Sequence, residues 1–166
     1  MKTELKRARQ IAEKYLNLLK PFCSRIEIAG SIRRQKSEVK DIEIVCIPQD
    51  VAGFAAQVKQ WPKVKGEPTG KYTQRNLPEG IKLDLFMAEE RNWGLILVIR
   101  TGPAEFNRSW LYQAKEKGLR CEDGFFRDYT ETGRNGQIIE CREERDLFKL
   151  IGMNYVEPKY RIAKYS

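Results

Sequence analysis

Residues 30–45 read GSIRRQKSEVKDIEIV, and this stretch constrains the fold more than any other part of the chain. It consists of a small-residue turn, a cluster of positive charge and an acid-apolar-acid sequence within an apolar run. If that run is a strand, alternation places Asp41 and Glu43 on one face and the isoleucine that follows each of them on the other. Two carboxylates on one face repel each other unless cations neutralise them. The stretch therefore predicts a strand with one apolar and one acidic face.

A second strand repeats this arrangement in residues 82–86, which read KLDLF. Its leucines face one side and Asp84 faces the other, where we expect it at an exposed edge. Hard oxygen ligands of this kind bind Mg²⁺, and a pair of such ions can hold the attacking and leaving oxygens of a phosphoryl transfer. A solvated, half-exposed strand face is the alternative explanation for each acid taken alone.

The segment between the turn and the first acid has groups that suit phosphate. Gly30 and Ser31 form a turn with exposed backbone N–H groups at the start of an expected short helix, and the cations Arg33, Arg34 and Lys36 follow. Such N–H groups and cations bind phosphate oxygens. Acids for a metal and donors for a phosphate thus lie in one segment, which favours a binding site over a solvated strand face.

The composition limits the chemistry and indicates a polyanionic partner. The chain has 166 residues, a net charge of +8 and no histidine, so His-based nucleophilic catalysis and His-ligated zinc are excluded. The positive charge attracts nucleic acid, although solubility alone would also explain it. The cysteines form no CxxC pair, and the sequence shows neither a signal peptide nor an apolar run long enough to cross a membrane. We therefore expect no membrane association and a cytoplasmic protein with reduced thiols, in the host cytoplasm if the chain is viral.

The apolar pattern and the glycine and proline punctuation predict a mixed α/β (α+β) fold. Helices are expected from a Thr3 cap to a stop at Pro21, and over about residues 51–61, 103–118 and 143–151. Strands are expected over residues 25–29, 41–47 and 81–87, with a hairpin in 64–77 and shorter strands around Phe125 and Ile138. The period of residues 93–99 does not decide between helix and strand. The Thr-Gly-Pro break predicts a lobe boundary near residues 100 to 103.

The turn and the acidic strands resemble the signature of the DNA polymerase beta superfamily of nucleotidyltransferases. That signature is a Gly-Ser turn, an acid-apolar-acid strand and a later strand with a third acid. Within the superfamily the chain is more closely similar to family X DNA polymerases, because GSIRR (residues 30–34) and TGPAEFN (residues 101–107) resemble two family X motifs. DLF at 146–148 and YVEPKYR at 155–161 also resemble the end of a family X polymerase. The resemblance covers nearly the whole chain.

The resemblance implies a DNA polymerase that adds nucleotides to a primer 3′-OH by two-metal-ion catalysis and releases pyrophosphate, in gap filling or repair. The cofactor would be a pair of Mg²⁺ ions, for which Mn²⁺ can substitute. The partners would be primer-template or gapped DNA and nucleoside triphosphates, bound by a monomer. The implied catalytic and metal-binding residues are Asp41, Glu43 and Asp84. The implied nucleotide-binding residues are Gly30, Ser31, Arg34, Gly102 and Asn107, and the implied DNA-binding residues are Arg33, Lys82, Arg100 and Arg108.

The resemblance also implies individual roles and a division into domains. Asp84 would hold the ion at the primer 3′ end, Gly102 would let the backbone approach the nucleotide sugar, and Asn107 would reach the minor-groove edge of the base. Residues 1–100 would form a nucleotidyltransferase palm-like domain whose mixed sheet holds the acids, and residues 101–166 a small C-terminal α/β lobe that binds nucleotide and DNA.

The sequence departs from the family pattern at three positions. Glu43 stands where Asp is usual, and Arg100 stands where an aromatic residue that screens the sugar 2′ position is common. Leu111 stands where polymerase beta has an arginine near the template. The residues before Gly30 leave no room for the N-terminal lyase domain of larger members, so we expect no lyase activity.

Two other functions remain open from the sequence. A nucleotidyltransferase that acts on RNA, a protein or a small molecule would keep the acids but would not need the segment 101–107. A non-catalytic DNA-binding module would need no acids, because they weaken phosphate binding.

Overall fold

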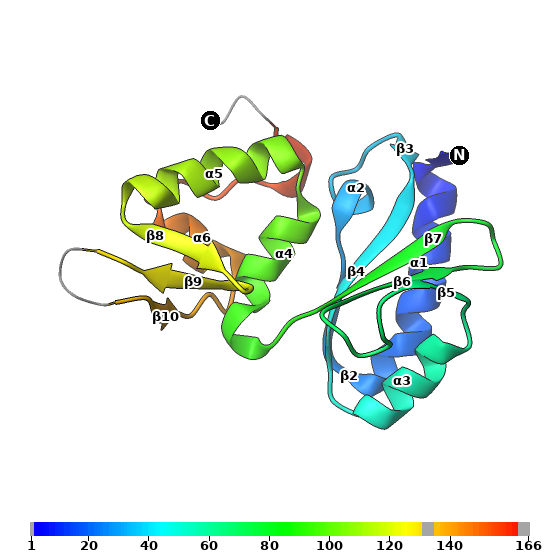
Figure 1. Cartoon of the computed structure of the whole chain (residues 1–166). Helices are drawn as coiled ribbons and strands as arrows, with labels where there is room; N and C mark the ends of the chain where they lie inside the picture. Colours follow the sequence, from blue (N-terminus) through cyan, green and yellow to red (C-terminus); the bar gives the residue numbers. More distant parts are fainter. Residues whose placement is uncertain (1, 131–134, 163–166) are drawn as a thin grey trace. The chain divides into compact units, whose positions relative to one another are not determined.

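The computed structural model describes residues 2–130 and 135–162, and the chain divides into two compact units, Met1–Ala88 and Glu89–Ser166 (Figure 1). Each unit has its own hydrophobic core. The division lies earlier in the chain than the boundary that the sequence suggested, because Leu95 and Val98 pack into the core of the second unit. The mixed α/β fold class is confirmed.

The first unit is built on a five-stranded mixed sheet with the order β2-β4-β7-β6-β5. Its strands are β2 (Cys23–Ile28), β4 (Asp41–Pro48), β5 (Lys63–Lys65), β6 (Tyr72–Asn76) and β7 (Lys82–Met87). β4 and β7 run parallel, and the other neighbouring pairs run antiparallel. The expected strands are therefore confirmed, and β5 and β6 form the expected hairpin.

Helices pack against one face of this sheet (Figure 1). They are α1 (Leu5–Leu19), the short α2 (Gly30–Arg33) and α3 (Val51–Lys59), and the 3-10 turn η1 (Lys20–Phe22) leads from α1 into β2. The expected Thr3 cap is wrong, because Thr3 pairs with Val39 where β1 (Thr3–Glu4) meets β3 (Glu38–Val39), and α1 begins after Glu4. Asp50 caps α3 by accepting a hydrogen bond of 3.0 Å from the backbone N–H of Gly53.

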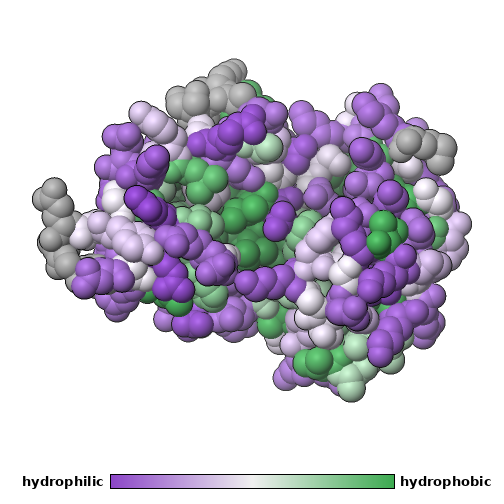
Figure 2. All heavy atoms as spheres, in the orientation of Figure 1, coloured by the Kyte–Doolittle hydropathy of each residue, from purple (hydrophilic) through white to green (hydrophobic). Residues whose placement is uncertain are grey.

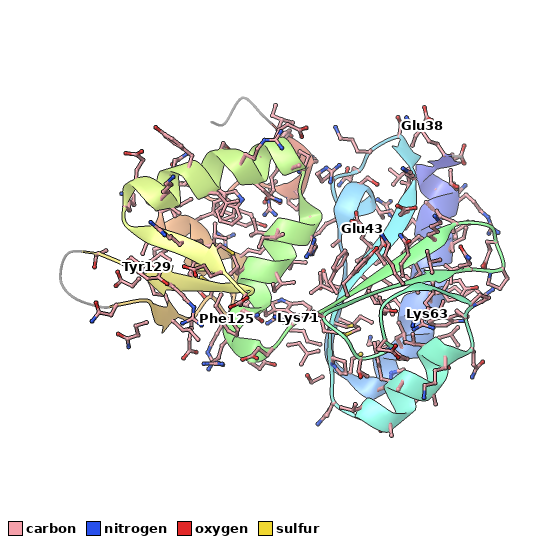
Figure 3. All side chains as sticks on the ribbon, in the orientation of Figure 1. Glu38, Glu43, Lys63, Lys71, Phe125 and Tyr129 are labelled. Atoms are coloured by element: carbon pink, nitrogen blue, oxygen red, sulfur yellow. The ribbon has the colours of Figure 1, made fainter. Side chains whose placement is uncertain are left out.

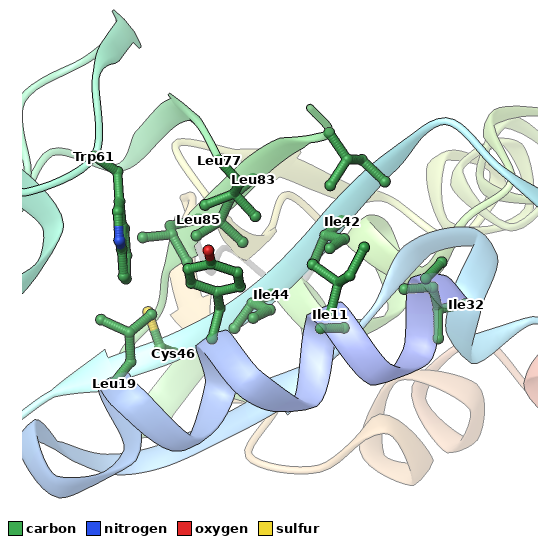
Figure 4. Packing of buried hydrophobic residues seen from close by; sticks show 14 of the residues in the cluster. Ile11, Leu19, Ile32, Ile42, Ile44, Cys46, Trp61, Leu77, Leu83 and Leu85 are labelled. Carbon is green, nitrogen blue, oxygen red and sulfur yellow. The ribbon is translucent and has the colours of Figure 1, made fainter. Parts of the chain in front are cut away.

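The covered face of the sheet forms the core of the first unit (Figure 4). The fully buried side chains of β4 and β7 in this core include Ile42, Ile44, Leu83 and Leu85. Each such burial stabilises the fold by about 1.5–3 kcal/mol. At one border of this core Trp61 packs edge-on against Tyr15, with ring centroids 5.1 Å apart. Because strand residues alternate, the packing of the isoleucines turns the acids of β4 to the opposite face.

The second unit combines helices with a small antiparallel sheet. Its helices are α4 (Trp93–Thr101), α5 (Ala104–Glu116) and α6 (Glu144–Leu150), with the 3-10 turns η2 (Glu90–Asn92) and η3 (Pro158–Tyr160). The sheet has the order β10-β9-β8, formed by β8 (Leu119–Glu122), β9 (Phe125–Asp128) and β10 (Gln137–Ile139). Aromatic side chains dominate the core between them, namely Phe106, Trp110, Phe126 and Phe148.

The apolar run at 93–99 forms helix α4, which the sequence could not assign. Residues 93–98 are all buried, so the helix has no polar side to reveal its period. α4 ends at Gly102, whose backbone φ of 66° and ψ of −155° favour glycine.

Polar side chains cover much of the visible face of each unit, with apolar patches between them (Figure 2). Among the residues that the structure describes, no helix has both the length and the apolar character that a membrane span requires.

Candidate active site

The acids predicted from the sequence lie on the sheet face opposite the core of the first unit. The parallel register of β4 and β7 pairs Glu43 with Asp84 and Asp41 with Lys82. Glu43, labelled in Figure 3, and Asp41 are half-buried, whereas only 6% of Asp84 is exposed. The predicted shared face of these carboxylates is therefore present in the fold.

Asp84 does not lie at the exposed edge that we expected from the sequence. β6 pairs with β7 on the side away from β4 and brings Gln74 directly opposite Asp84. The Gln74 side-chain Nε2 donates a hydrogen bond of 2.7 Å to Oδ1 of Asp84, and the Tyr72 hydroxyl donates one of 2.8 Å to the same oxygen. The neighbouring strand thus covers this carboxylate.

Burial raises the pKa of Asp84 above its ordinary value, because the charged form is poorly solvated there. The hydrogen bonds from Tyr72 and Gln74 oppose that effect, and the charge of Asp41 adds to it. The structure thus places a poorly solvated carboxyl group beside a second acid. A nearby cation would stabilise its charged form.

The pKa of the Tyr72 hydroxyl is affected by the charges of all three acids. Burial, the hydrogen bond to Asp84 and the charges of Asp84, Asp41 and Glu43 all raise the pKa of its hydroxyl. Its ring stacks on Phe86 of β7, with centroids 5.0 Å apart and an interplanar angle of 14°. The three carboxylates therefore act on one hydroxyl group.

The predicted phosphate-binding turn packs directly against this acidic face. Gly30 begins α2 with φ of 63°, and a Cβ atom at this position would collide with the carboxylate of Glu43. The backbone N–H of Ala29 also donates a hydrogen bond of 2.8 Å to the Glu43 carbonyl oxygen.

Within residues 2–130 and 135–162, no group of three or more His, Cys, Asp and Glu side chains is arranged to hold a metal ion.

The predicted phosphate- and DNA-binding residues of the first unit lie in or just after α2 and on β7, the elements that pack against or pair with the acidic strand β4. Ser31, Arg33 and Arg34 are half-buried in and just after α2, and Lys82 is exposed on β7 opposite Asp41. The Ser31 carbonyl oxygen accepts a hydrogen bond of 3.0 Å from the backbone N–H of Lys36, which closes the turn. The fold thus brings the predicted metal and phosphate residues of residues 30–84 into one region.

The remaining predicted site residues are placed within the second unit only. Gly102 ends α4, and Arg100 and Arg108 are exposed on α4 and α5. The side-chain Nδ2 of Asn107 donates a hydrogen bond of 2.8 Å to the Ile99 carbonyl oxygen, and its Oδ1 accepts one of 2.9 Å from the indole of Trp110. In this structure Asn107 therefore ties α5 to α4.

Sequence reasoning missed Tyr72 and Gln74. Both lie on β6 with one residue between them, so they share a face, and the antiparallel register aims that face at the acid of β7. The alternation was visible in the sequence, but the register was not, because the loop between β6 and β7 does not determine it.

The fold and site define a two-unit α+β chain with an acidic sheet face beside a glycine turn. Residues 96–162 match the family model described as DNA polymerase beta thumb. DNA polymerase IV of Saccharomyces cerevisiae is 26% identical over 153 residues, which cover 90% of this chain and 24% of the yeast protein. DNA polymerase lambda of Rattus norvegicus is 30% identical over 86 residues, which cover 48% of this chain and 15% of the rat protein.

These matches support a likeness to family X DNA polymerases, as the motifs of the sequence indicated. The chain spans a quarter or less of the length of these curated relatives, 24% and 15%.

Proposed function

We propose that this chain is a DNA polymerase that adds nucleotides to a primer 3′-OH and releases pyrophosphate, in gap filling or repair. The observation that carries the proposal is the packing of the Gly30 turn against the acidic face formed by Asp41, Glu43 and Asp84. The match to the polymerase beta thumb in the second unit supports it, because such a match is independent of the acids.

The carboxylates suit Mg²⁺ or Mn²⁺ in chemical kind, since both ions prefer oxygen ligands. Asp41, Glu43 and Asp84 would hold the ions. Bound there, such ions would supply charge stabilisation for the attacking and leaving oxygens of the transfer. As they stand, no three acids of the described residues are arranged to hold a metal ion, so cation binding would have to draw Asp41, Glu43 and Asp84 together.

Other residues of the chain would bind and orient the substrates. Ser31 and Arg34 would bind the triphosphate, and Arg33 and Lys82 would bind DNA phosphates near the primer end. Their closeness to the acids in the first unit supports these roles.

The second unit would contribute contacts to the nucleotide and the duplex. Gly102 has no side chain to keep the backbone from the sugar, and Arg100 and Arg108 are exposed cations. Two internal hydrogen bonds already use one N–H of the Asn107 amide and one lone pair of its oxygen. The second N–H and the second lone pair would be available to a base edge.

Extension of a primer on gapped DNA with all four nucleotides in Mg²⁺ or Mn²⁺ tests the proposal. Asp84→Asn suits this test, because Asn keeps the shape that Tyr72 and Gln74 contact and removes the charge. We expect template-directed extension by the wild type and a loss of several orders of magnitude in Asp84→Asn. Extension by Asp84→Asn at the wild-type rate would contradict the two-metal assignment. DNA binding by a wild type that never extends would favour a non-catalytic module, and transfer only to RNA or protein would favour another nucleotidyltransferase.

A further inference from the structure

Two uncharged donors converge on one oxygen of the Asp84 carboxylate. The Tyr72 hydroxyl and the Gln74 amide both bond to Oδ1, at 2.8 and 2.7 Å. Oδ1 has two lone pairs for acceptance, so these donors satisfy it.

Both donors are held firmly by the surrounding structure. Gln74 is 8% exposed and lies opposite Asp84 in the β6–β7 ladder. Tyr72 lies opposite Phe86, on which its ring stacks, and the ammonium group of Lys65 lies over the Tyr72 ring at 5.8 Å from its centroid. Both donors thus reach Oδ1 from packed positions in the sheet, which restricts the rotamers that Asp84 can adopt.

The neutrality of the donors is as important as their position. A lysine or arginine bonded to Asp84 would cancel the negative charge that attracts a cation, whereas a hydroxyl and an amide orient the carboxylate and leave its charge in place. The ammonium of Lys65 lies over the Tyr72 ring and acts on Asp84 through its charge.

We propose that Tyr72 and Gln74 are positioning residues that bond Oδ1 of Asp84 and thereby present its Oδ2 to the divalent cation and the primer 3′ end. This inference rests on the proposed function. It extends the site to residues on β6 that neither the acids nor the motifs identify.

The test compares Mn²⁺ binding by calorimetry with single-nucleotide extension on gapped DNA. Tyr72→Phe removes only the hydroxyl, and Gln74→Met removes the amide at nearly constant volume. Removal of a partner that orients a metal ligand typically costs about 10–100-fold in metal affinity or activity. We expect such a loss in Mn²⁺ affinity and in kcat for each variant, with little change in the KM for the nucleotide.

Tyr15→Phe is a matched control in the same unit. Tyr15 also donates to a carboxylate, with 2.6 Å between its hydroxyl and Oε1 of Glu79, but Glu79 does not belong to the acidic face. This variant should lose stability and keep the Mn²⁺ affinity and kcat of the wild type.

Each outcome decides between the two proposals. A wild type that neither binds Mn²⁺ nor extends DNA overturns the proposed function and this inference with it. A wild type that does both, with Tyr72→Phe and Gln74→Met equal to it, overturns this inference alone. Equal losses of Mn²⁺ affinity in Tyr72→Phe and Tyr15→Phe would mean that stability is being measured, and would also overturn it. Losses confined to the β6 variants support it.

Discussion

At the scale of single residues, Gly30 is constrained twice. Its φ of 63° lies in the left-handed region, which costs other residues about 1–2 kcal/mol. In addition, a side chain there would displace the Glu43 carboxylate. The turn proposed for phosphate and the acid proposed for metal are therefore sterically linked.

Gly30→Ala should lower the free energy of unfolding by more than backbone strain alone. Gly80→Ala is the matched control, because Gly80 has φ of 86° and nothing lies within 4 Å of a Cβ placed there. We expect Gly80→Ala to cost about 1–2 kcal/mol in urea unfolding and Gly30→Ala to cost more. Equal losses would show that Glu43 moves aside without cost.

Glu79 gives the first unit a predictable response to acid. Burial alone would raise the pKa of Glu79, but hydrogen bonds from Tyr15 and Lys14 outweigh burial and hold the pKa below its ordinary value. Folding therefore favours the charged form of Glu79. The resulting stability is present above the ordinary glutamate pKa and is lost as the pH falls through the lower pKa of the folded state.

The change Glu79→Gln should remove this pH dependence. We expect it to lower the free energy of unfolding near neutral pH, and we expect the difference from the wild type to shrink as the pH is lowered. Urea unfolding of both proteins across the acid range measures it. A difference that stays constant with pH would show that the Glu79 charge contributes nothing.

The acids could be placed on one face from the sequence because strand alternation is a local property. The isoleucines next to Asp41 and Glu43 are enough to show on which face of the strand the two acids lie. The partners of Asp84 could not be found in this way, because Tyr72 reaches it through the register between strands. The bond from Asn107 to Ile99 was missed for a similar reason, since it depends on how one helix packs against another.

At the scale of elements, the junction between α4 and α5 depends on the orientation of one amide. Nδ2 of Asn107 faces the Ile99 carbonyl oxygen, and Oδ1 faces the Trp110 indole. An aspartate at this position would keep the second bond and place an oxygen against the carbonyl.

Asn107→Asp should therefore destabilise the second unit. Loss of the donor costs about 1–3 kcal/mol, whereas a negative charge in the first turn of α5 gains only about 0.3–1 kcal/mol from the helix dipole. Thermal unfolding should show a lower midpoint for this variant, with the exposed Arg108→Ala near the wild type as control. An unchanged midpoint would mean that the helix dipole offsets the lost bond.

Element types were predictable wherever one side of an element is polar, as in α1 and β4. The sequence did not decide whether α4 is a helix or a strand, because α4 is buried on all sides and therefore lacks the apolar–polar pattern on which such predictions depend. The predicted start of α1 was wrong because Thr3, although a good capping residue, lies in β1 and pairs with Val39 of β3.

At the scale of the whole molecule, the net charge of +8 predicts binding to DNA governed by ion release. If about four to six phosphates are neutralised, log affinity should fall with log salt at a slope of roughly −4 to −5 on duplex DNA. Filter binding or fluorescence anisotropy over a salt series measures this slope. An affinity that barely responds to salt would contradict the expectation.

Arg100→Ala should reduce that slope by about one unit if Arg100 contacts a phosphate. Lys149→Ala, on α6, is a control with the same change in net charge and no predicted role. Equal effects of the two substitutions would mean that only the overall charge is important. A change in the preference between ribo- and deoxyribonucleotides in Arg100→Ala would instead place this residue by the sugar.

The distribution of indole rings makes the two units optically distinguishable. Trp61 is buried in the first unit against Tyr15, whereas Trp93 and Trp110 are buried in the second. With Trp61 replaced by Phe, tryptophan emission excited selectively at the red edge of the absorption band would come from residues 89–166 alone. Emission from Trp61, obtained by difference, would report on the unit that holds the acids. Cation binding and loss of structure could thus be assigned to one unit or the other without any added dye.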